Sequence, residues 1–282
     1  MSGGTQEAFE AERPRLTGLA YRMLGSVVDA EDIVQDAWFR WGRATEVRAP
    51  ASFLTTVVVR LCLDRLKSAQ VRRETLVGTW LPEPWVGQPP PRDPVLASSM
   101  SFAVLRLLEA LTPPQRAAFL LRDVFDHDYA DIAAILETTA ANARQLVRRA
   151  RAHLADPPRF DADEQARERL YAQLTTAMTQ GDLTGLLAVL ADDATAYSDG
   201  GGVVQAHRTP IEGAAKIVQA YTHFAGLLPR EARMEPAWVN GLPGWVTRVG
   251  DAVQAVHAVE IRDGRVVALY AVLDPAKLGR VS

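Results

Sequence analysis

Apolar residues in about the first 155 positions recur every three or four residues, which predicts helices. The segment AEDIVQDAWFRW (30–41) keeps its apolar side chains on one helical face, and Asp29 stands where an N-cap residue is expected. The segment FLTTVVVRLCLDRLKSA (53–69) is rich in β-branched residues, which alone would favour a strand. Because its charged residues Arg60, Asp64 and Lys67 share one side, an amphipathic helix is predicted instead.

Helical spacing continues from about Leu96 to Ala155. Thr112 followed by Pro113 and Pro114 predicts a helix start, with an N-cap residue and prolines in the first turn. The stretch ADIAAIL (130–136) predicts a short helix that ETT interrupts, and Thr139 can cap the helix that follows.

The pattern changes in the last third of the chain. Helical spacing holds for Glu164–Thr179 and Thr209–Leu227, and alternating runs then predict strands. Arg262-Asp263-Gly264 is a hairpin turn signal between two of these strands. The strand runs are ARMEPAWVN, GWVTRVG, DAVQAVHAVEIRDG and RVVALYAVLD. Helices followed by several antiparallel strands predict an α+β domain.

Two proline-rich stretches, Trp80–Pro94 and Ala155–Asp163, interrupt these patterns. We therefore expect a helical domain over 1–76, a proline-rich linker over 77–95, a second helical domain over 96–155 and an α+β domain over 161–282.

Composition narrows the class of protein. The chain has 282 residues, of which 48% are apolar, so it can bury more than one core. Its single cysteine, Cys62, permits no internal disulfide and lies in an apolar helical pattern, so a buried, inert thiol is predicted. Neither a membrane-length apolar run nor a signal-peptide pattern is present. A cytoplasmic protein without a membrane partner is expected.

The segment TAANARQLVRRARAHL (139–154) holds four arginines and no acid, although the whole chain has a formal net charge of −3. On a helix, Arg144, Arg148 and Arg151 form a ridge opposite an apolar face, and Gln145 and Arg149 stand beside it. A short helix, a turn and this longer basic helix predict a helix-turn-helix. Arginines bind phosphates and guanine edges and glutamine reads adenine, whereas the alternative is a solvated arginine-rich helix without a ligand.

Four segments in this order resemble a bacterial sigma factor of the extracytoplasmic-function (ECF) class. They are AEDIVQDAWFRW, FLTTVVVRLCLDRLKSA, LTPPQRAAFLLRDVFDHDYADIAAI and ANARQLVRRARAHL. The resemblance implies two all-α domains: a region 2 bundle and a region 4 helix-turn-helix. The chain departs from the family pattern in having Phe53 where tryptophan is usual and Glu137 where the turn often has glycine.

The same resemblance implies roles for particular residues. Asp32, Gln35 and Asp36 match positions that dock on the β′ clamp helices of core RNA polymerase. Arg60, Asp64 and Lys67 lie in the part that reads the −10 element of promoter DNA. The −35 element is read from the last helix, where the candidates are Arg144, Gln145, Arg148 and Arg149.

Three further motifs, WLPEP (80–84), DGGG (199–202) and DPAKL (274–278), resemble the marks of an ECF subgroup with a C-terminal SnoaL-like domain. The resemblance implies an α+β cone, a curved antiparallel sheet around a cavity, which tunes sigma activity from within the chain. A small ligand in that cavity is a further candidate partner. Val203 and Asp274 stand where the subgroup has a basic residue and asparagine. The residues assigned an interdomain regulatory role are Trp80, Leu81, Pro82, Glu83, Pro84, Asp199, Gly200, Gly201, Gly202, Asp274, Pro275, Lys277 and Leu278.

SnoaL-like domains can also be enzymes, and an active cyclase or isomerase fused to a DNA-binding module is the alternative hypothesis. Its candidates are His207, His223, His257, Asp199 and Tyr197. No two of them stand at a spacing that requires catalysis, and no HExxH-type metal motif occurs. The DGGG stretch lacks the lysine and following helix of a phosphate-binding loop. The sequence thus predicts a promoter-specific sigma factor that is not an enzyme and has no catalytic residue, metal or cofactor.

Overall fold

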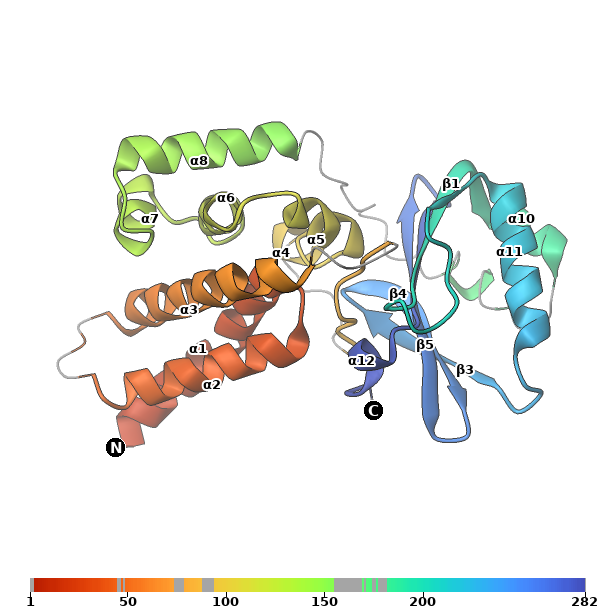
Figure 1. Cartoon of the computed structure of the whole chain (residues 1–282), viewed down its shortest axis with the longest axis horizontal. Helices are drawn as coiled ribbons and strands as arrows, with labels where there is room; N and C mark the ends of the chain where they lie inside the picture. Colours follow the sequence, from red (N-terminus) through yellow and green to blue (C-terminus); the bar gives the residue numbers. More distant parts are fainter. Residues whose placement is uncertain are drawn as a thin grey trace. The chain divides into compact units, whose positions relative to one another are not determined.

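The computed structural model of the chain describes residues 3–44, 47, 49–73, 79–87, 94–154, 169, 171–173, 176 and 182–281. The chain forms two compact units (Figure 1). The first comprises Met1–Thr75 and Ala103–Pro157, and the second comprises Leu76–Phe102 and Pro158–Ser282. Within the described ranges, no helix has both the length and the apolar character needed to cross a membrane.

The first unit is helical, as the residue spacing predicts. Its elements are α1 (Gly3–Leu24), α2 (Val27–Trp41), α3 (Pro50–Arg73), most of α5 (Phe102–Glu109), α6 (Pro113–Phe119), the π-helical turn η1 (Leu120–Val124), α7 (Tyr129–Ile135) and α8 (Ala140–His153). Helix α1 packs against α2 and α3, and α3 also packs against α6 and α7. Cys62 is buried in α3, where desolvation raises the pKa of its thiol, so the expected buried position is confirmed.

The predicted helix starts are confirmed at α6 and α8 but not at α2. The main-chain N–H of Thr112 donates to Gln115 Oε1 at 3.1 Å, and Thr139 Oγ1 accepts from the N–H of Asn142 at 3.2 Å. Helix α2 is capped by Ser26, whose hydroxyl accepts from the N–H of Asp29 at 3.1 Å, so the expectation of an Asp29 cap was wrong. Asp29 lies in the first turn instead, where a carboxylate is favoured by the helix dipole.

The second unit holds a six-stranded sheet with helices. The strands are β1 (Leu190–Asp199), β2 (Ile211–Glu212), β3 (Arg233–Val239), β4 (Leu242–Val249), β5 (Ala252–Arg262) and β6 (Arg265–Val272), in the order β2-β1-β6-β5-β4-β3. The helices are α4 (Pro94–Ser98), α10 (Leu183–Val189), α11 (Ala214–Leu227) and α12 (Pro275–Leu278). The α+β class is as expected, and within the otherwise antiparallel sheet β1 and β6 pair in parallel.

Of the elements predicted from sequence for this unit, some are confirmed, one begins later than expected and one lies outside the described residues. Strands β3 to β6 and the turn between β5 and β6 are confirmed, with Asp263 and Gly264 at φ of 50° and 68° as a two-residue turn needs. The helix expected over Thr209–Leu227 begins later, at Ala214, because Ile211 and Glu212 pair with β1. The helix expected over Glu164–Thr179 falls almost entirely outside the described residues.

Helix α11 lies along one face of the sheet (Figure 1) and buries the main core of the unit. Ile217 and Val218 of α11 pack with Leu190 of β1, Trp245 of β4 and Val259 of β5. Ala214 lies three and four positions before Ile217 and Val218, so the three share the face of α11 that meets the strands.

Candidate nucleic-acid interface and linker clamp

Helices α7 and α8 form the predicted helix-turn-helix. The turn passes through Glu137 at φ 52°, a left-handed conformation in which glycine is usual, and the N–H of Thr138 bonds the carbonyl of Ala133 at 2.9 Å. Ala143, Val147 and Ala150 of α8 are buried. The opposite side of α8 is exposed, and we call Arg144, Gln145, Arg148 and Arg149 its basic face.

The basic face is partly ordered by local contacts. Arg148 donates to Gln145 Oε1 at 2.8 Å, and the guanidinium of Arg144 lies 5.2 Å from the ring centre of Tyr129. Arg151, by contrast, pairs with Asp123 of η1, with Nε 3.0 Å from Oδ2. Arg151 therefore holds α8 in the unit, whereas the four basic-face residues project from it.

The acidic edge of α2 consists of Asp32, Gln35 and Asp36, all of them exposed. Positions three and four apart share one helical side. Phe39 continues this side and is 56% exposed, an unusual state for a large apolar residue. Sequence reasoning did not single out Phe39, although its spacing from Gln35 and Asp36 was the available signal.

The three residues expected at the −10 element differ in their surroundings. Asp64 and Lys67 are exposed and pair with each other at 3.3 Å. Arg60 is engaged within the unit: its Nε and Nη2 donate to the carbonyls of Ile135 and Ala134, each at 3.2 Å. Its Nη1 lies 3.0 Å from the carboxylate of Glu137. The structure thus ties α3 to the turn of the helix-turn-helix.

The motifs WLPEP, DGGG and DPAKL come together in the second unit. Leu81 is fully buried, and its main-chain N–H donates to Asp199 Oδ2 at 2.8 Å. Lys277 Nζ donates to the Leu81 carbonyl at 2.7 Å and to Asp199 Oδ2 at 2.6 Å. The Lys277 ammonium also lies 5.0 Å from the ring centre of Trp80. We call Leu81, Asp199 and Lys277 the linker clamp.

Pro82, Glu83 and Pro84 are buried as well, beside the clamp in sequence. Proline side chains and a buried main chain give this stretch a fixed course. Its backbone is held by hydrogen bonds at Leu81 and again at Trp85. The WLPEP stretch is therefore part of the second unit's core.

Two of the three glycines of DGGG, Gly200 and Gly201, allow neighbouring atoms to approach the backbone closely. A Cβ on Gly201, which has φ +62°, would lie 2.3 Å from the carboxyl carbon of Asp274, and a Cβ on Gly200 would lie 2.1 Å from the Val204 carbonyl oxygen. Asp274 caps α12 by accepting from the N–H of Ala276 at 3.0 Å, a role that aspartate fills as well as asparagine. Pro275 and Leu278 belong to α12, with Leu278 buried. Gly202 faces open space and Val203 is 79% exposed.

A second attachment of the linker was missed by sequence reasoning. Asn240 is fully buried, and its Oδ1 accepts from the N–H of Trp85 at 3.0 Å, while its own N–H bonds the Trp85 carbonyl at 2.9 Å. Its Nδ2 donates to the carbonyl of Met100 at 3.0 Å. Asn240 and Gly241 have φ of 54° and 72°, as in a two-residue hairpin turn. The Asn-Gly pair signals such a turn, but not a side chain that binds a distant segment.

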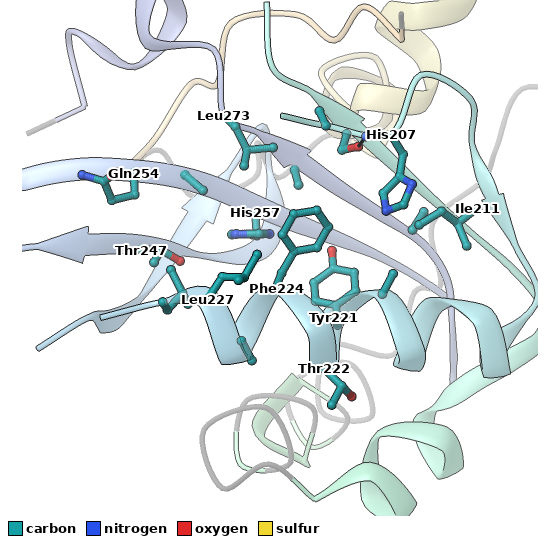
Figure 2. A pocket seen from close by; sticks show the side chains of 18 of the residues that line it. His207, Ile211, Tyr221, Thr222, Phe224, Leu227, Thr247, Gln254, His257 and Leu273 are labelled. Atoms are coloured by element: carbon teal, nitrogen blue, oxygen red, sulfur yellow. Dashed lines mark hydrogen bonds between the residues drawn. The ribbon is translucent and has the colours of Figure 1, made fainter. Parts of the chain in front are cut away.

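Three of the five residues named for the enzyme alternative line a cavity of about 360 Å³ in the second unit. His257 lies in its wall and His207 at an exposed position (Figure 2). Tyr197 also lines the cavity. His223 and Asp199 are not among its lining residues. No group of histidine, cysteine and acidic side chains suited to a metal occurs among the described residues.

Comparisons with known proteins agree with this geometry. The sequence matches the family model Sigma-70 region 2 over residues 8–72 and the model Sigma-70, region 4 over residues 101–154. It is 40% identical over 289 residues to the ECF RNA polymerase sigma factor SigJ of Mycobacterium tuberculosis, covering 95% of this chain and 91% of SigJ. It is 32% identical over 281 residues to the probable ECF RNA polymerase sigma factor SigI of that species, covering 96% of this chain and 93% of SigI. The crystal structure of SigJ aligns with a TM-score of 0.75 at 37% identity, over 96% of this chain and 97% of that one.

Proposed function

Because this chain belongs to the ECF sigma factors of RNA polymerase, we propose that it binds core RNA polymerase and directs it to promoters by reading −10 and −35 elements. We further propose that its second unit regulates this activity within the same chain. The functional division would follow 1–76, 96–155 and 161–282, with 77–95 as the linker.

The basic face of α8 is the observation that carries the proposal. Arg144, Gln145, Arg148 and Arg149 are exposed on the second helix of a helix-turn-helix, and that helix contains no acidic residue. Exposed arginines attract phosphates, and such a helix enters the major groove with its side chains toward the base edges. The overall negative charge of the chain does not oppose this, because a local basic surface is sufficient.

The acidic edge of α2 supports the proposed docking on the polymerase clamp. Asp32, Gln35 and Asp36 are free of the unit's core, and Phe39 adds an exposed apolar side chain beside them. The carboxylates can attract a basic partner surface. The exposed aromatic side chain can be buried in the complex and so contribute to the free energy of binding.

The arrangement within the first unit supports a closed state that does not read DNA. The guanidinium of Arg60 is occupied by the carbonyls at the end of α7 and by Glu137. The same contacts hold the turn before α8 against α3. For Arg60 to contact the −10 element, its guanidinium must therefore leave these carbonyls and the carboxylate of Glu137.

The linker clamp supports the proposed regulation. The two segments of the first unit, Met1–Thr75 and Ala103–Pro157, are joined in sequence by residues that belong to the second unit. The clamp holds the main chain of Leu81, and Asn240 holds that of Trp85 and Met100. A linker fixed at these points reaches less far than a free one, so release or retention of the clamp would set how far the DNA-reading segments can separate.

The chemistry of the cavity supports a binding role rather than acid–base catalysis. Burial lowers the pKa of His257 to about 4 and raises the pKa of Tyr221, so both groups are neutral at pH 7. A general base works best with a pKa near the working pH. Asp182 is the one carboxylate among the described lining residues, and it is exposed and caps α10.

Run-off transcription with core RNA polymerase over a promoter library tests the proposal. Wild-type chain should give promoter-dependent transcripts, Arg149→Ala should reduce them, and Lys277→Met should change yield or promoter choice. The proposal of sigma activity fails if the wild-type chain, with core bound in a pull-down, gives no promoter-dependent product. The proposal of internal regulation fails if folded Lys277→Met and Asp199→Asn chains transcribe as wild type does.

A further inference from the structure

The cavity of the second unit lies between α11 and the sheet. Figure 2 shows Tyr221, Phe224 and Leu227 projecting from the helix toward strands that carry Thr247 and His257. Its volume of about 360 Å³ falls in the range of small-molecule pockets, which is about 300–1,000 Å³. The space is therefore large enough for a ring system of modest size.

The walls of the cavity are mostly apolar. Ile211, Phe224, Leu227, Met234 and Leu273 contribute aliphatic and aromatic surface. Among the described lining residues there is no lysine or arginine, and the single carboxylate, Asp182, is exposed. A charged ligand would lose its hydration here without gaining a buried counter-charge, which is strongly unfavourable.

A few polar groups in the cavity have unmet hydrogen-bonding capacity. The hydroxyl of Tyr221 has no hydrogen-bond partner among the described residues, and His257 Nδ1 and Trp245 Nε1 are buried without one. Trp245 and His257 pair across β4 and β5, and their rings stack with centroids 4.7 Å apart. The centroids of the Tyr221 and His257 rings are 6.2 Å apart. Buried polar groups in native proteins are normally paired with protein, water or a ligand.

We propose that this cavity binds a neutral, mainly apolar small molecule carrying a hydrogen-bonding oxygen, held by the Tyr221 hydroxyl and the His257 imidazole. The apolar walls supply the contact area, and the oxygen satisfies one or both of the polar groups. A neutral imidazole has one donor and one acceptor nitrogen, so a ketone and an alcohol both meet the requirement. The inference concerns binding alone, so it stands independently of sigma activity.

Titration calorimetry on the full-length chain tests the inference with matched probes. The probes are neutral aromatic ketones such as 2-acetylnaphthalene and their anionic counterparts such as 2-naphthoate. We expect saturable one-to-one binding of neutral probes and at least tenfold weaker binding of the anions.

Two variants and a control locate the site. Tyr221→Phe keeps the ring and removes the hydroxyl, so it should weaken ketone binding about fivefold, as loss of one hydrogen bond predicts. Ala220→Leu adds bulk at the wall and should abolish binding, with folding checked by circular dichroism. Tyr129→Phe, the matched substitution in the first unit, should leave affinity unchanged. The inference is overturned if no neutral probe binds the folded wild-type chain, if anions bind as tightly, or if Tyr221→Phe and folded Ala220→Leu both bind as wild type does.

Discussion

Lys277 donates a hydrogen bond of 2.7 Å to the main-chain carbonyl of Leu81, a residue 196 positions earlier in the chain. Asp199 accepts from the N–H of the same leucine, so one ion pair binds both polar groups of a single linker residue. The pair is largely withdrawn from water, with Lys277 18% and Asp199 6% exposed at the side chain. Recognition of its main chain by a buried ion pair thus helps to fix the path of the linker, together with the buried side chains of Leu81, Pro82 and Pro84.

The linker clamp should contribute measurably to stability. Lys277→Met keeps the side-chain length but leaves the Asp199 carboxylate buried without its counter-charge. We expect the free energy of unfolding of the full-length chain to fall by about 3 kcal/mol, the low end for breaking a buried ion pair. Urea unfolding measures the change, and Lys216→Met, at an exposed lysine, is the matched control.

A double variant separates the pair from its parts. Asp199→Asn with Lys277→Met removes both charges, so it should cost clearly less than the sum of the two single substitutions. If the losses in free energy of unfolding are additive, the two residues act independently, and their ion pair does not stabilise the linker clamp.

The basic face of α8 should carry promoter recognition. Arg148→Ala and Arg149→Ala each remove an exposed guanidinium from α8. The helix contains no acidic residue, so neither substitution leaves a carboxylate of the helix without an ion-pair partner. We expect each to weaken binding to the −35 element by about 1–3 kcal/mol if the side chain reads a base. Footprinting measures protection, and Arg230→Ala, at an exposed arginine of the second unit, should have no effect. Full protection in both α8 variants would contradict the assignment.

The acidic edge of α2 should mediate docking on core polymerase. Asp36→Arg reverses a charge at an exposed position, so it should change stability by no more than about 0.5 kcal/mol. We expect at least tenfold weaker binding of core polymerase, measured by pull-down at matched concentrations. Asp251→Arg, in an exposed turn of the second unit, is the control. A folded Asp36→Arg chain that retains core as wild type does would refute the role.

Most elements could be predicted from local patterns, because each buries one face against its neighbours. Helices α2 and α3 and strands β3 to β6 follow the helical and alternating spacings of their apolar residues. Strand β1 was not predicted, because Asp192 and Asp193 near its start are both exposed and break the alternation of apolar and polar residues. The late start of α11 has a similar cause, since the pairing of Ile211 with β1 is a non-local event.

The residues of the candidate site could be predicted from the sequence, but their contacts with distant residues could not. The basic, acid-free surface of α8 can be predicted from residue spacing alone, because exposed and buried positions recur every three or four residues on a helix. Nothing local indicates that Arg60 would bond the end of α7, or that Asn240 would hold Trp85 and Met100. These contacts join residues that lie far apart in sequence. The spacing of apolar and polar residues along the chain is the same whether or not the contacts form.

The buried imidazole of His257 should make stability depend on pH. Burial lowers its pKa to about 4 in the folded chain, against an ordinary value of 6.5, so the unfolded chain binds the proton more readily in that interval. Stability from this group is therefore complete above about pH 6.5 and is lost as the pH falls toward 4, by about 2 kcal/mol at pH 5. Urea unfolding at pH 7 and pH 5 measures the loss. It should be smaller by that amount in His257→Gln, and an equal loss in both chains would exclude His257 as its source.

The contact between Arg60 and Glu137 should favour the closed first unit. Its partners are 42% and 74% exposed, so the ion pair is worth at most about 1 kcal/mol, or about a fivefold change in the ratio of closed to open chain. Glu137→Gln removes the charge but leaves Arg60 able to reach DNA. We expect this variant to bind promoter DNA up to about fivefold more tightly at low salt, with the difference shrinking as salt screens the pair. Asp126→Asn is the matched control, because Asp126 is a highly exposed carboxylate shortly before α7 that pairs with Arg122 and not with Arg60. Weaker DNA binding by Glu137→Gln, with the control unchanged, would show that Glu137 supports the DNA-reading state and that the contact with α3 does not restrain it.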